Sequence, residues 1–280
     1  MISDPETDIN IKDLVLTEPT KLNGEKFDPQ KELFPSDWQR EKELLAEDVV
    51  KDIYSSWATF FGEASMLKFI DPKSLARLGI NLADYQFQAA SWFREAKAGA
   101  ELPHVLSNAF DYKFLYPQKA TNLILPSERL KQLFDPEFHL SATQANALLH
   151  LYYLDSDLAK STGAFEKLHS KFISELTVST GETQWKNHHD ALMLASALKI
   201  LYPDEPISLG IIETLLKYGR DDMEQGRQNP GKSGIVGTFQ DARNLLILTA
   251  DRVTIEDGQF KFENKSDHFS VEKPPETRRF

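Results

Sequence analysis

Between about residue 36 and residue 251, apolar side chains recur every three or four positions, which is the period of an amphipathic α-helix. Ser36 and Gln39 form a capping-box pattern, in which two side chains satisfy free N–H groups at a helix start. We therefore expect one long helix after Ser36. Its apolar face is made by five residues spaced by three or four positions: Leu45, Val49, Ile53, Trp57 and Phe60.

Later segments repeat this pattern. Asp71-Pro72 and Asp135-Pro136 each place an N-cap residue before a proline at the first helical position, which marks a helix start. Ser141 with Gln144 forms another capping box and predicts a helix from Ser141 onward. The other helices are expected over residues 82–99, 101–116, 127–134, 165–176, 185–202, 211–216 and 238–251.

One segment near the C-terminus has a period of two instead. Residues 253–262 alternate around Asp257-Gly258, a pair that supplies the positive φ angles of a type I′ turn. A β-hairpin is therefore expected over residues 252–263. An isolated hairpin is marginally stable in water, so this one should pack against the last helices.

Three helices begin in a similar way, with Gln144, Asp190 or Asp241 followed by Ala and then by apolar residues. These starts are 46 and 51 residues apart, which is about two helices and two loops per step. Such a period is typical of stacked helical hairpins. The predicted fold class is therefore all-α, with stacked antiparallel helical hairpins and a small C-terminal β-hairpin. The order of helices resembles an armadillo- or HEAT-like solenoid, or part of an α/α toroid.

The two ends of the chain differ from the helical region. Residues 1–35 have little apolar periodicity and contain four prolines, which predicts an extended or disordered N-terminal arm. Residues 264–280 are polar and predict a disordered C-terminal tail. Residues 36–263 are expected to form a single helical domain, a size that can bury a substantial core.

Composition excludes several classes of protein. The net charge of −11 argues against binding to nucleic acid or to anionic lipid. Cysteine is absent, so the chain has no disulfide and no thiolate ligand or nucleophile. No apolar run approaches 18 residues, and the N-terminus is acidic where a signal peptide would be basic. We therefore expect a cytoplasmic protein that contacts neither a membrane nor nucleic acid.

Residues 226–233 match the letters of a P-loop, G-x-x-x-x-G-K-S. In a P-loop the backbone amides hold phosphates, and the residues at the positions of Gly231, Lys232 and Ser233 contact the phosphates and Mg²⁺. A P-loop also follows a buried strand, whereas residues 220–225 are polar and typical of a helix end. A glycine-rich loop over 226–237 between two helices explains the pattern as well. Binding of a nucleotide or an anion by this loop is one alternative function.

A second alternative is based on His188-His189-Asp190. Metal-dependent phosphohydrolases of the HD type are all-α and bind divalent metal with a His, a His-Asp pair and a distant Asp. The order of candidate residues here is similar to that family: His169 or His150 upstream, then His189 with Asp190, then Asp251. The resemblance implies a metal centre made by His169, His189, Asp190 and Asp251. Asp190 also has a structural role available to it, at the positive end of a helix dipole.

The leading interpretation is a non-enzymatic interaction protein that needs no cofactor. Both motif matches lack part of the sequence context that their chemistry requires. Aromatic residues at Tyr152-Tyr153 and along 110–116 are difficult to bury completely, and a groove lined by them suits a protein or peptide partner. The expected function is therefore a helical-repeat scaffold, with the HD-like hydrolase and the nucleotide or anion binder as alternatives.

Overall fold

The computed structural model describes residues 38–53, 57–78, 101–118, 127–137, 140–181, 188–228 and 235–263. The predicted arm over residues 1–35, the predicted tail over 264–280 and the helix expected over 82–99 lie outside these ranges. Within them the chain is mostly helical, with a two-stranded antiparallel sheet at its C-terminal end, as predicted. None of the described helices is long and apolar enough to cross a membrane.

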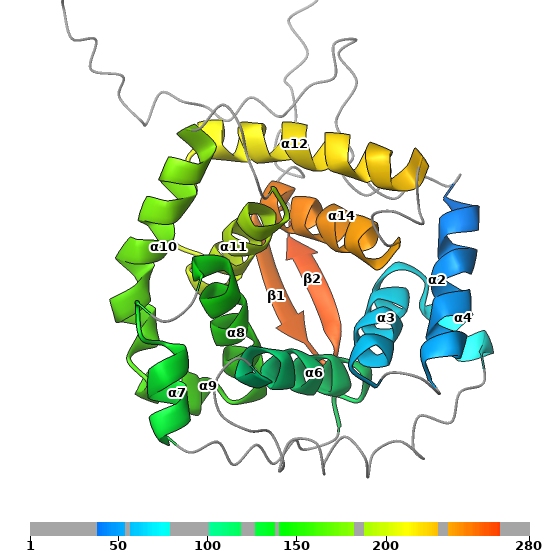
Figure 1. Ribbon diagram of the computed structural model, residues 1–280, viewed down its shortest axis with the longest axis horizontal. Coiled ribbons are helices and arrows are strands. Elements are labelled where there is room, and N and C mark those ends of the chain that lie inside the picture. Colours follow the sequence, from blue (N-terminus) through cyan, green and yellow to red (C-terminus); the bar gives the residue numbers. More distant parts are fainter. Residues whose placement is uncertain are drawn as a thin grey trace, which may run out of the picture.

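Five helices lie side by side around the middle of the molecule (Figure 1). These inner helices are α3 (Trp57–Ile70), α6 (Glu101–Leu115), α8 (Ser141–Leu154), α11 (His188–Leu201) and α14 (Ile235–Thr249). The outer helices are α2 (Gln39–Asp52), α4 (Pro72–Arg77), α7 (Ser127–Leu133), α9 (Ser156–Ser161), α10 (Ala164–Gly181) and α12 (Leu209–Gln228). The strands β1 (Arg252–Glu256) and β2 (Gln259–Glu263) complete the described part of the chain.

The inner helices form a closed ring. Each of them packs against the next in chain order, and the last, α14, packs against both α3 and α2. Trp38, just before α2, contacts Phe239 of α14 edge to face, with ring centroids 5.4 Å apart. One continuous apolar core extends through the inner helices and the outer helices that cover them. The two ends of this core thus meet, which brings side chains from α3 and α14 together.

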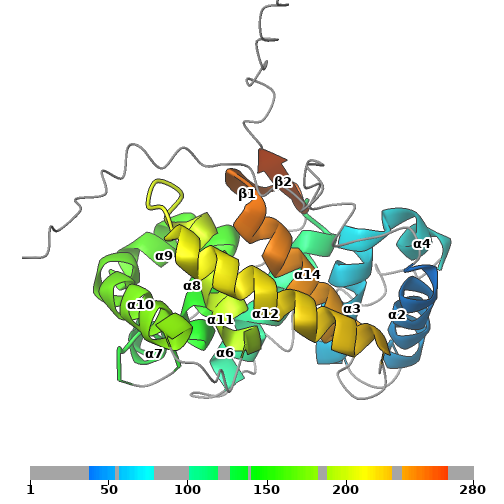
Figure 2. The same cartoon turned by 90° about the horizontal axis from the view of Figure 1, so that it is seen from above.

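The inner helices all direct their C-terminal ends toward the β-hairpin. Residues from the last turns of the five helices contact β1, β2 or the turn between them: Lys68, Phe69, Phe114, Tyr153, Ile200 and Ile247. Figure 2 shows the hairpin on one side of the ring of helices. The hairpin therefore covers one end of the ring, and the helix N-termini lie at the other.

The hairpin follows the predicted turn chemistry. Val253 pairs with Phe262 and Glu256 with Gln259, so the two-residue turn is Asp257-Gly258. Both turn residues have positive φ angles, 50° and 67°, as a type I′ turn requires. A Cβ on Gly258 would come within 2.1 Å of the Phe114 carbonyl oxygen. Glycine is therefore required both for the turn and for its close contact with the end of α6.

Three local predictions are wrong. The apolar stripe from Leu45 to Phe60 belongs to two helices, α2 and α3, which pack against each other as a hairpin. Asp135-Pro136 forms a turn rather than a helix start, and the Asp135 carboxylate accepts a hydrogen bond from the Glu137 amide. Ser141 is inside α8, whose N-cap is Leu140, and no side chain caps that helix. Asp71 and Pro72, in contrast, begin α4 as predicted.

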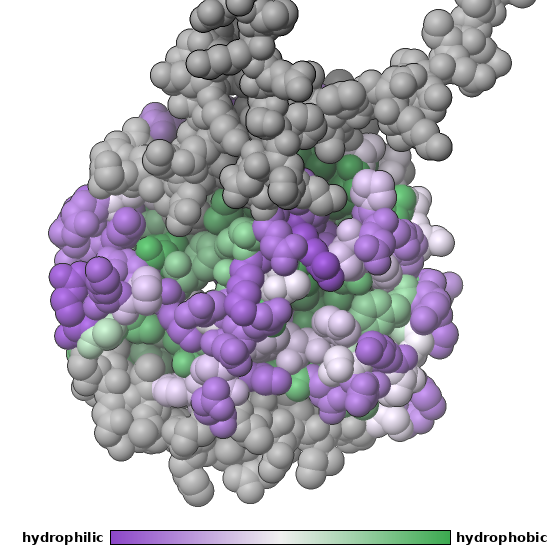
Figure 3. Space-filling view, turned by 180° about the vertical axis from the view of Figure 1, so that it is seen from behind, coloured by the Kyte–Doolittle hydropathy of each residue, from purple (hydrophilic) through white to green (hydrophobic). Residues whose placement is uncertain are grey.

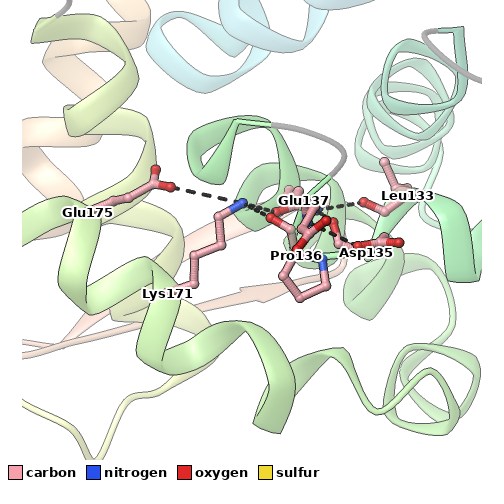
Figure 4. Close-up of polar contacts among 7 residues, drawn as sticks. Leu133, Asp135, Pro136, Glu137, Lys171 and Glu175 are labelled. Carbon is pink, nitrogen blue, oxygen red and sulfur yellow. Dashed lines mark hydrogen bonds and ion pairs between the residues drawn. The ribbon is translucent and has the colours of Figure 1, made fainter.

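Gln144 has a tertiary role in place of helix capping. Its amide nitrogen donates hydrogen bonds to the Leu133 and Asp135 carbonyls, at 2.9 and 2.7 Å. Lys171 of the outer helix α10 donates to the Gln144 amide oxygen at 3.0 Å and to the Pro136 carbonyl at 2.6 Å (Figure 4). This network, which we call the outer network, attaches the connection between α7 and α8 to α10. Its polar atoms come from segments that are far apart in the sequence.

Candidate functional site

Four inner helices place polar side chains in the apolar interior of the ring. These side chains are Ser65 on α3, Asp111 on α6, His150 on α8 and Arg243 on α14. We call these four residues the inner polar cluster. Ser65, Asp111 and His150 are 2, 8 and 6% exposed. Buried polar side chains are usually satisfied by hydrogen bonds, because leaving them unpaired costs free energy. In the inner polar cluster, some buried polar atoms have no hydrogen-bond partner among the described residues.

Asp111 is partly satisfied. The Ser65 hydroxyl donates a hydrogen bond of 2.6 Å to one carboxylate oxygen, Oδ1. Among the described residues, the other oxygen, Oδ2, has no hydrogen-bond partner. Burial raises the pKa of Asp111 to about 6, and the Ser65 hydrogen bond and the charge of Arg243 oppose that rise. At neutral pH the carboxylate is therefore mostly ionised and keeps one oxygen available.

Arg243 lacks a direct partner. No hydrogen bond or ion pair joins its guanidinium to any described residue, and its Nε is buried without an acceptor. The Phe260 ring of β2 lies over it, with 5.3 Å from the guanidinium carbon to the ring centroid. Burial lowers the pKa of Arg243, while the charge of Asp111 opposes that shift. Asp111 and Arg243 therefore interact through space without forming an ion pair.

His150 stacks on Phe110, with ring centroids 4.5 Å apart, and its buried Nδ1 has no hydrogen-bond partner among the described residues. Burial is the main reason that the pKa of His150 is lowered to about 3, and the charge of Arg243 contributes in the same direction. The imidazole is therefore neutral at neutral pH. A neutral imidazole offers one donor nitrogen and one acceptor nitrogen.

The hairpin covers the end of the ring nearest to this cluster. Phe260 contacts Phe69 of α3 and Phe114 of α6, with centroids 5.5 Å apart in both pairs, and it also lies over Arg243. The Gly258 amide donates a hydrogen bond to Tyr153 at the end of α8. Phe260 thus covers the guanidinium of Arg243 from the hairpin side.

A second polar pair lies toward the opposite end of the ring. Nδ1 of His189 on α11 is 2.8 Å from Oδ1 of Asp241 on α14. The His189 side chain is 42% exposed, whereas that of Asp241 is 10% exposed. The hydrogen bond with Asp241 is the main reason that the pKa of His189 is raised, and the charges of Asp190 and Asp222 contribute. This pair links two neighbouring inner helices.

The residues of the predicted metal centre lie on different elements. His189 and Asp190 are in the first turn of α11, and Asp251 lies between α14 and β1. His169, on the outer helix α10, has its Nε2 2.6 Å from a Glu205 carboxylate oxygen. His150 belongs to the inner polar cluster. Across the described ranges, no three His, Asp or Glu side chains are grouped so that they could hold a metal ion.

The P-loop match lies mostly outside the described residues, since Gly231, Lys232 and Ser233 fall in the gap between 228 and 235. Gly226 is described, and it belongs to the last part of α12. The residues that precede it are therefore helical, in the position where a P-loop has a strand. The helix therefore includes the first three residues of the predicted glycine-rich loop, 226–228.

Sequence reasoning did not identify Ser65, Asp111 or Arg243, and it considered His150 only as a metal ligand. A signal was nevertheless available in two helices. Asp111 lies in the mostly apolar stretch 109–115, and Arg243 lies just before the apolar run 245–248. A charged side chain on the apolar face of a buried helix is rare unless it is paired. What the sequence could not show is that these two faces meet.

The fold and the cluster together define a ring of paired helices around buried, incompletely satisfied polar groups. Comparisons of the chain with protein-family models, with curated proteins and with solved structures gave no match.

Proposed function

We propose that this protein binds a small organic anion inside its ring of helices, with Arg243 as the anchoring group. The observation that carries the proposal is the guanidinium itself, which is surrounded by inner helices and has no hydrogen-bond or ion-pair partner among the described residues. A ligand carboxylate or phosphate would supply the acceptors that the chain does not.

The energetics favour this interpretation. Removing a guanidinium from water costs several kcal/mol unless a paired anion compensates it. Asp111 compensates only from a distance, because no direct ion pair forms. Arginine is also suited to hold a carboxylate or a phosphate by two parallel hydrogen bonds. The donors of Arg243 are thus left without an acceptor among the described residues.

We further infer that the helices form an α/α toroid rather than an open solenoid. Contact of α14 with α3 and α2 supports a closed arrangement, in which inner helices alternate along the chain with outer ones. A toroid surrounds its central residues from all sides and suits a small ligand, whereas a solenoid offers an extended groove. Since the hairpin covers one end, the ligand would approach from the end where the inner helices begin.

The experiment is a thermal-shift titration of purified protein with acetate, succinate and inorganic phosphate at constant ionic strength. A ligand at about 100 times its Kd stabilises the folded state by about 2.7 kcal/mol. We expect at least one of these anions to raise the Tm of the wild type, and we expect Arg243→Met to abolish that rise. Arg252→Met, which removes an exposed arginine of β1, is the matched control and should keep the response. Equal responses of Arg243→Met and the wild type would refute the proposal.

A protein or peptide partner, the expectation from the sequence, is the second candidate. In the part of the chain that the structure describes, the large apolar side chains that are exposed are Val50, Leu140, Tyr152 and Ile173. Figure 3 shows the face of the molecule opposite to that in Figure 1. On this face, apolar surface lies in recesses beside polar side chains that cross its middle. Leu140, at 69% exposure, is the most exposed of the four and precedes α8. If a partner binds there, Leu140→Ser should weaken a complex isolated with the full chain, while Arg243→Met should not.

A further inference from the structure

We infer that the ligand is a zwitterion, an α-amino acid or a close analogue, which presents its carboxylate to Arg243 and its ammonium group to Asp111. This inference rests on the proposed anion site and specifies the ligand that the site takes. It is based on three features of the inner polar cluster: the separation of its two charges, the groups each charge leaves available, and the absence of net charge.

The first feature is the separation of Asp111 from Arg243. The two charges lie on α6 and α14, which are separated in the ring by α3, and no direct ion pair connects them. They are nevertheless close enough to influence each other electrostatically. A buried Asp and Arg that could meet would normally do so, because a direct pair offsets part of their desolvation. A ligand with two opposite charges could bridge the two residues, each of which lacks a direct ion pair with the other.

The second feature is the chemistry each residue leaves unused. Arg243 offers donors, and Asp111 offers the acceptor oxygen Oδ2, which has no partner among the described residues. An ammonium group needs acceptors, and a carboxylate needs donors. Ser65 already holds the other oxygen of Asp111 at 2.6 Å, which fixes the orientation of that carboxylate. A ligand with both groups would complete both residues.

The third feature is charge balance. One arginine and one aspartate sum to zero, and His150 is neutral because burial lowers its pKa to about 3. A zwitterion enters such a site without adding net charge. A simple carboxylate would leave an excess negative charge in the ring, and a simple amine an excess positive one, each at a desolvation cost. The site therefore favours a ligand that carries one charge of each sign.

The neighbouring side chains agree with this assignment. Phe110 and Phe114 of α6 stack on each other, and Phe260 lies over Arg243 from the hairpin. Among the described residues, the only charged group that shifts the pKa of Asp111 is Arg243, and the only one that shifts the pKa of Arg243 is Asp111. The described surroundings thus match an amino acid whose side chain is apolar.

The test is calorimetric titration of the wild-type protein with three matched probes: leucine, 4-methylpentanoate, which lacks the amine, and 3-methylbutylamine, which lacks the carboxylate. We expect leucine to bind at least about tenfold more tightly than either analogue, which corresponds to about 1.4 kcal/mol. Equal binding of leucine and 4-methylpentanoate would overturn the inference. If that binding still required Arg243, the proposed anion site would stand. Failure of all three probes, and of acetate, succinate and phosphate, would overturn both.

Asp111→Asn provides a second measurement. It keeps the shape of the side chain and removes the charge that would hold the ammonium group. We expect it to weaken leucine binding about tenfold and to leave 4-methylpentanoate binding unchanged or stronger. Asp157→Asn, at an exposed position on α9, is the matched control. Unchanged leucine binding by Asp111→Asn would overturn the inference. If this variant does not fold, the three probes on the wild type decide the question alone.

Discussion

The outer network and the inner polar cluster both place a long cationic side chain among buried polar groups. The two regions differ in the hydrogen-bond partners that they give this side chain. Lys171 has the Pro136 carbonyl and the Gln144 amide oxygen within hydrogen-bond distance, and Glu175 lies 3.9 Å away. Arg243 has no such acceptor among the described residues, although Asp111 is near.

This difference indicates what each site is for. A satisfied network stabilises the fold, since every buried donor and acceptor has its partner. An unsatisfied cluster costs stability, and the binding of an anion that we propose would offset that cost. The comparison therefore predicts that removing groups from the outer network destabilises the protein, whereas removing the cation of the inner polar cluster does not.

The largest change in the free energy of unfolding is expected at Gln144, which is fully buried. Gln144→Ala would leave the Leu133 and Asp135 carbonyls without their donor and Lys171 without one acceptor. Each unsatisfied buried group costs about 1–3 kcal/mol, so we expect a loss of about 2–4 kcal/mol in the free energy of unfolding. Urea denaturation measures it. Gln132→Ala, at an exposed position of α7, is the control and should change stability little. A loss below about 1 kcal/mol would mean that the outer network does not stabilise the fold.

A second prediction concerns the pH dependence of stability that His150 of the inner polar cluster produces. The pKa of His150 in the folded state is about 3, below its usual value of 6.5. The unfolded chain therefore binds a proton in this range that the folded protein does not, and the contribution of His150 to stability falls as pH decreases from 6.5 toward 3.

Asp111 contributes in the opposite direction, because its pKa is raised from 3.8 to about 6. Its contribution to stability falls as pH increases through that range. Subtracting the curve of His150→Gln from that of the wild type isolates the histidine. We expect the wild type to lose about 1–3 kcal/mol more than His150→Gln between pH 6.5 and pH 4. Parallel curves would show that the imidazole is not held neutral by burial.

The smallest expected change in the free energy of unfolding comes from replacing the two cations, Arg243 and Lys171. It is also the most direct test of the difference between the two regions. Without added ligand, Arg243→Met should leave the free energy of unfolding unchanged or raise it by about 1 kcal/mol, since it replaces a half-buried cation that has no direct partner among the described residues with an apolar chain. Lys171→Met should lower it by about 1 kcal/mol, because it removes paired hydrogen bonds. The measurement is the difference in free energy of unfolding between the two variants, and its sign tests the prediction. A larger loss for Arg243→Met would mean that Arg243 has a structural partner.

The features that the sequence predicts correctly are local ones. Asp257-Gly258 specifies its turn within two residues, and Asp71-Pro72 begins α4 by a contact with Ser74, three residues away. The Ser141–Gln144 pattern fails for a physical reason. Gln144 bonds to carbonyls of a preceding segment, which outcompete the local cap. The apolar stripe from Leu45 to Phe60 fails because helical spacing continues in phase across the connection between α2 and α3.

The inner polar cluster could not be predicted in the same way, because its contacts are nonlocal. Ser65 and Asp111 are 46 residues apart in the sequence. Asp111 and Arg243 are brought near each other only by closure of the ring. A pattern along the chain shows that a charged residue lies in an apolar helix, but it does not show which helix faces it. The predicted scaffold function depended on the absence of recognisable motifs, and an unpaired buried arginine has no motif.

Closure of the ring also has a consequence for the order in which the protein is made. Helices α2 and α3 are synthesised early. The helix that packs against both of them, α14, is synthesised about 180 residues later, just before the hairpin. Contacts of such large sequence separation form slowly, and until they form the apolar faces of α3 and α14 remain exposed to other chains. A nascent chain that has not yet released α14 from the ribosome therefore cannot assemble the cluster, and it presents the surfaces that chaperones bind.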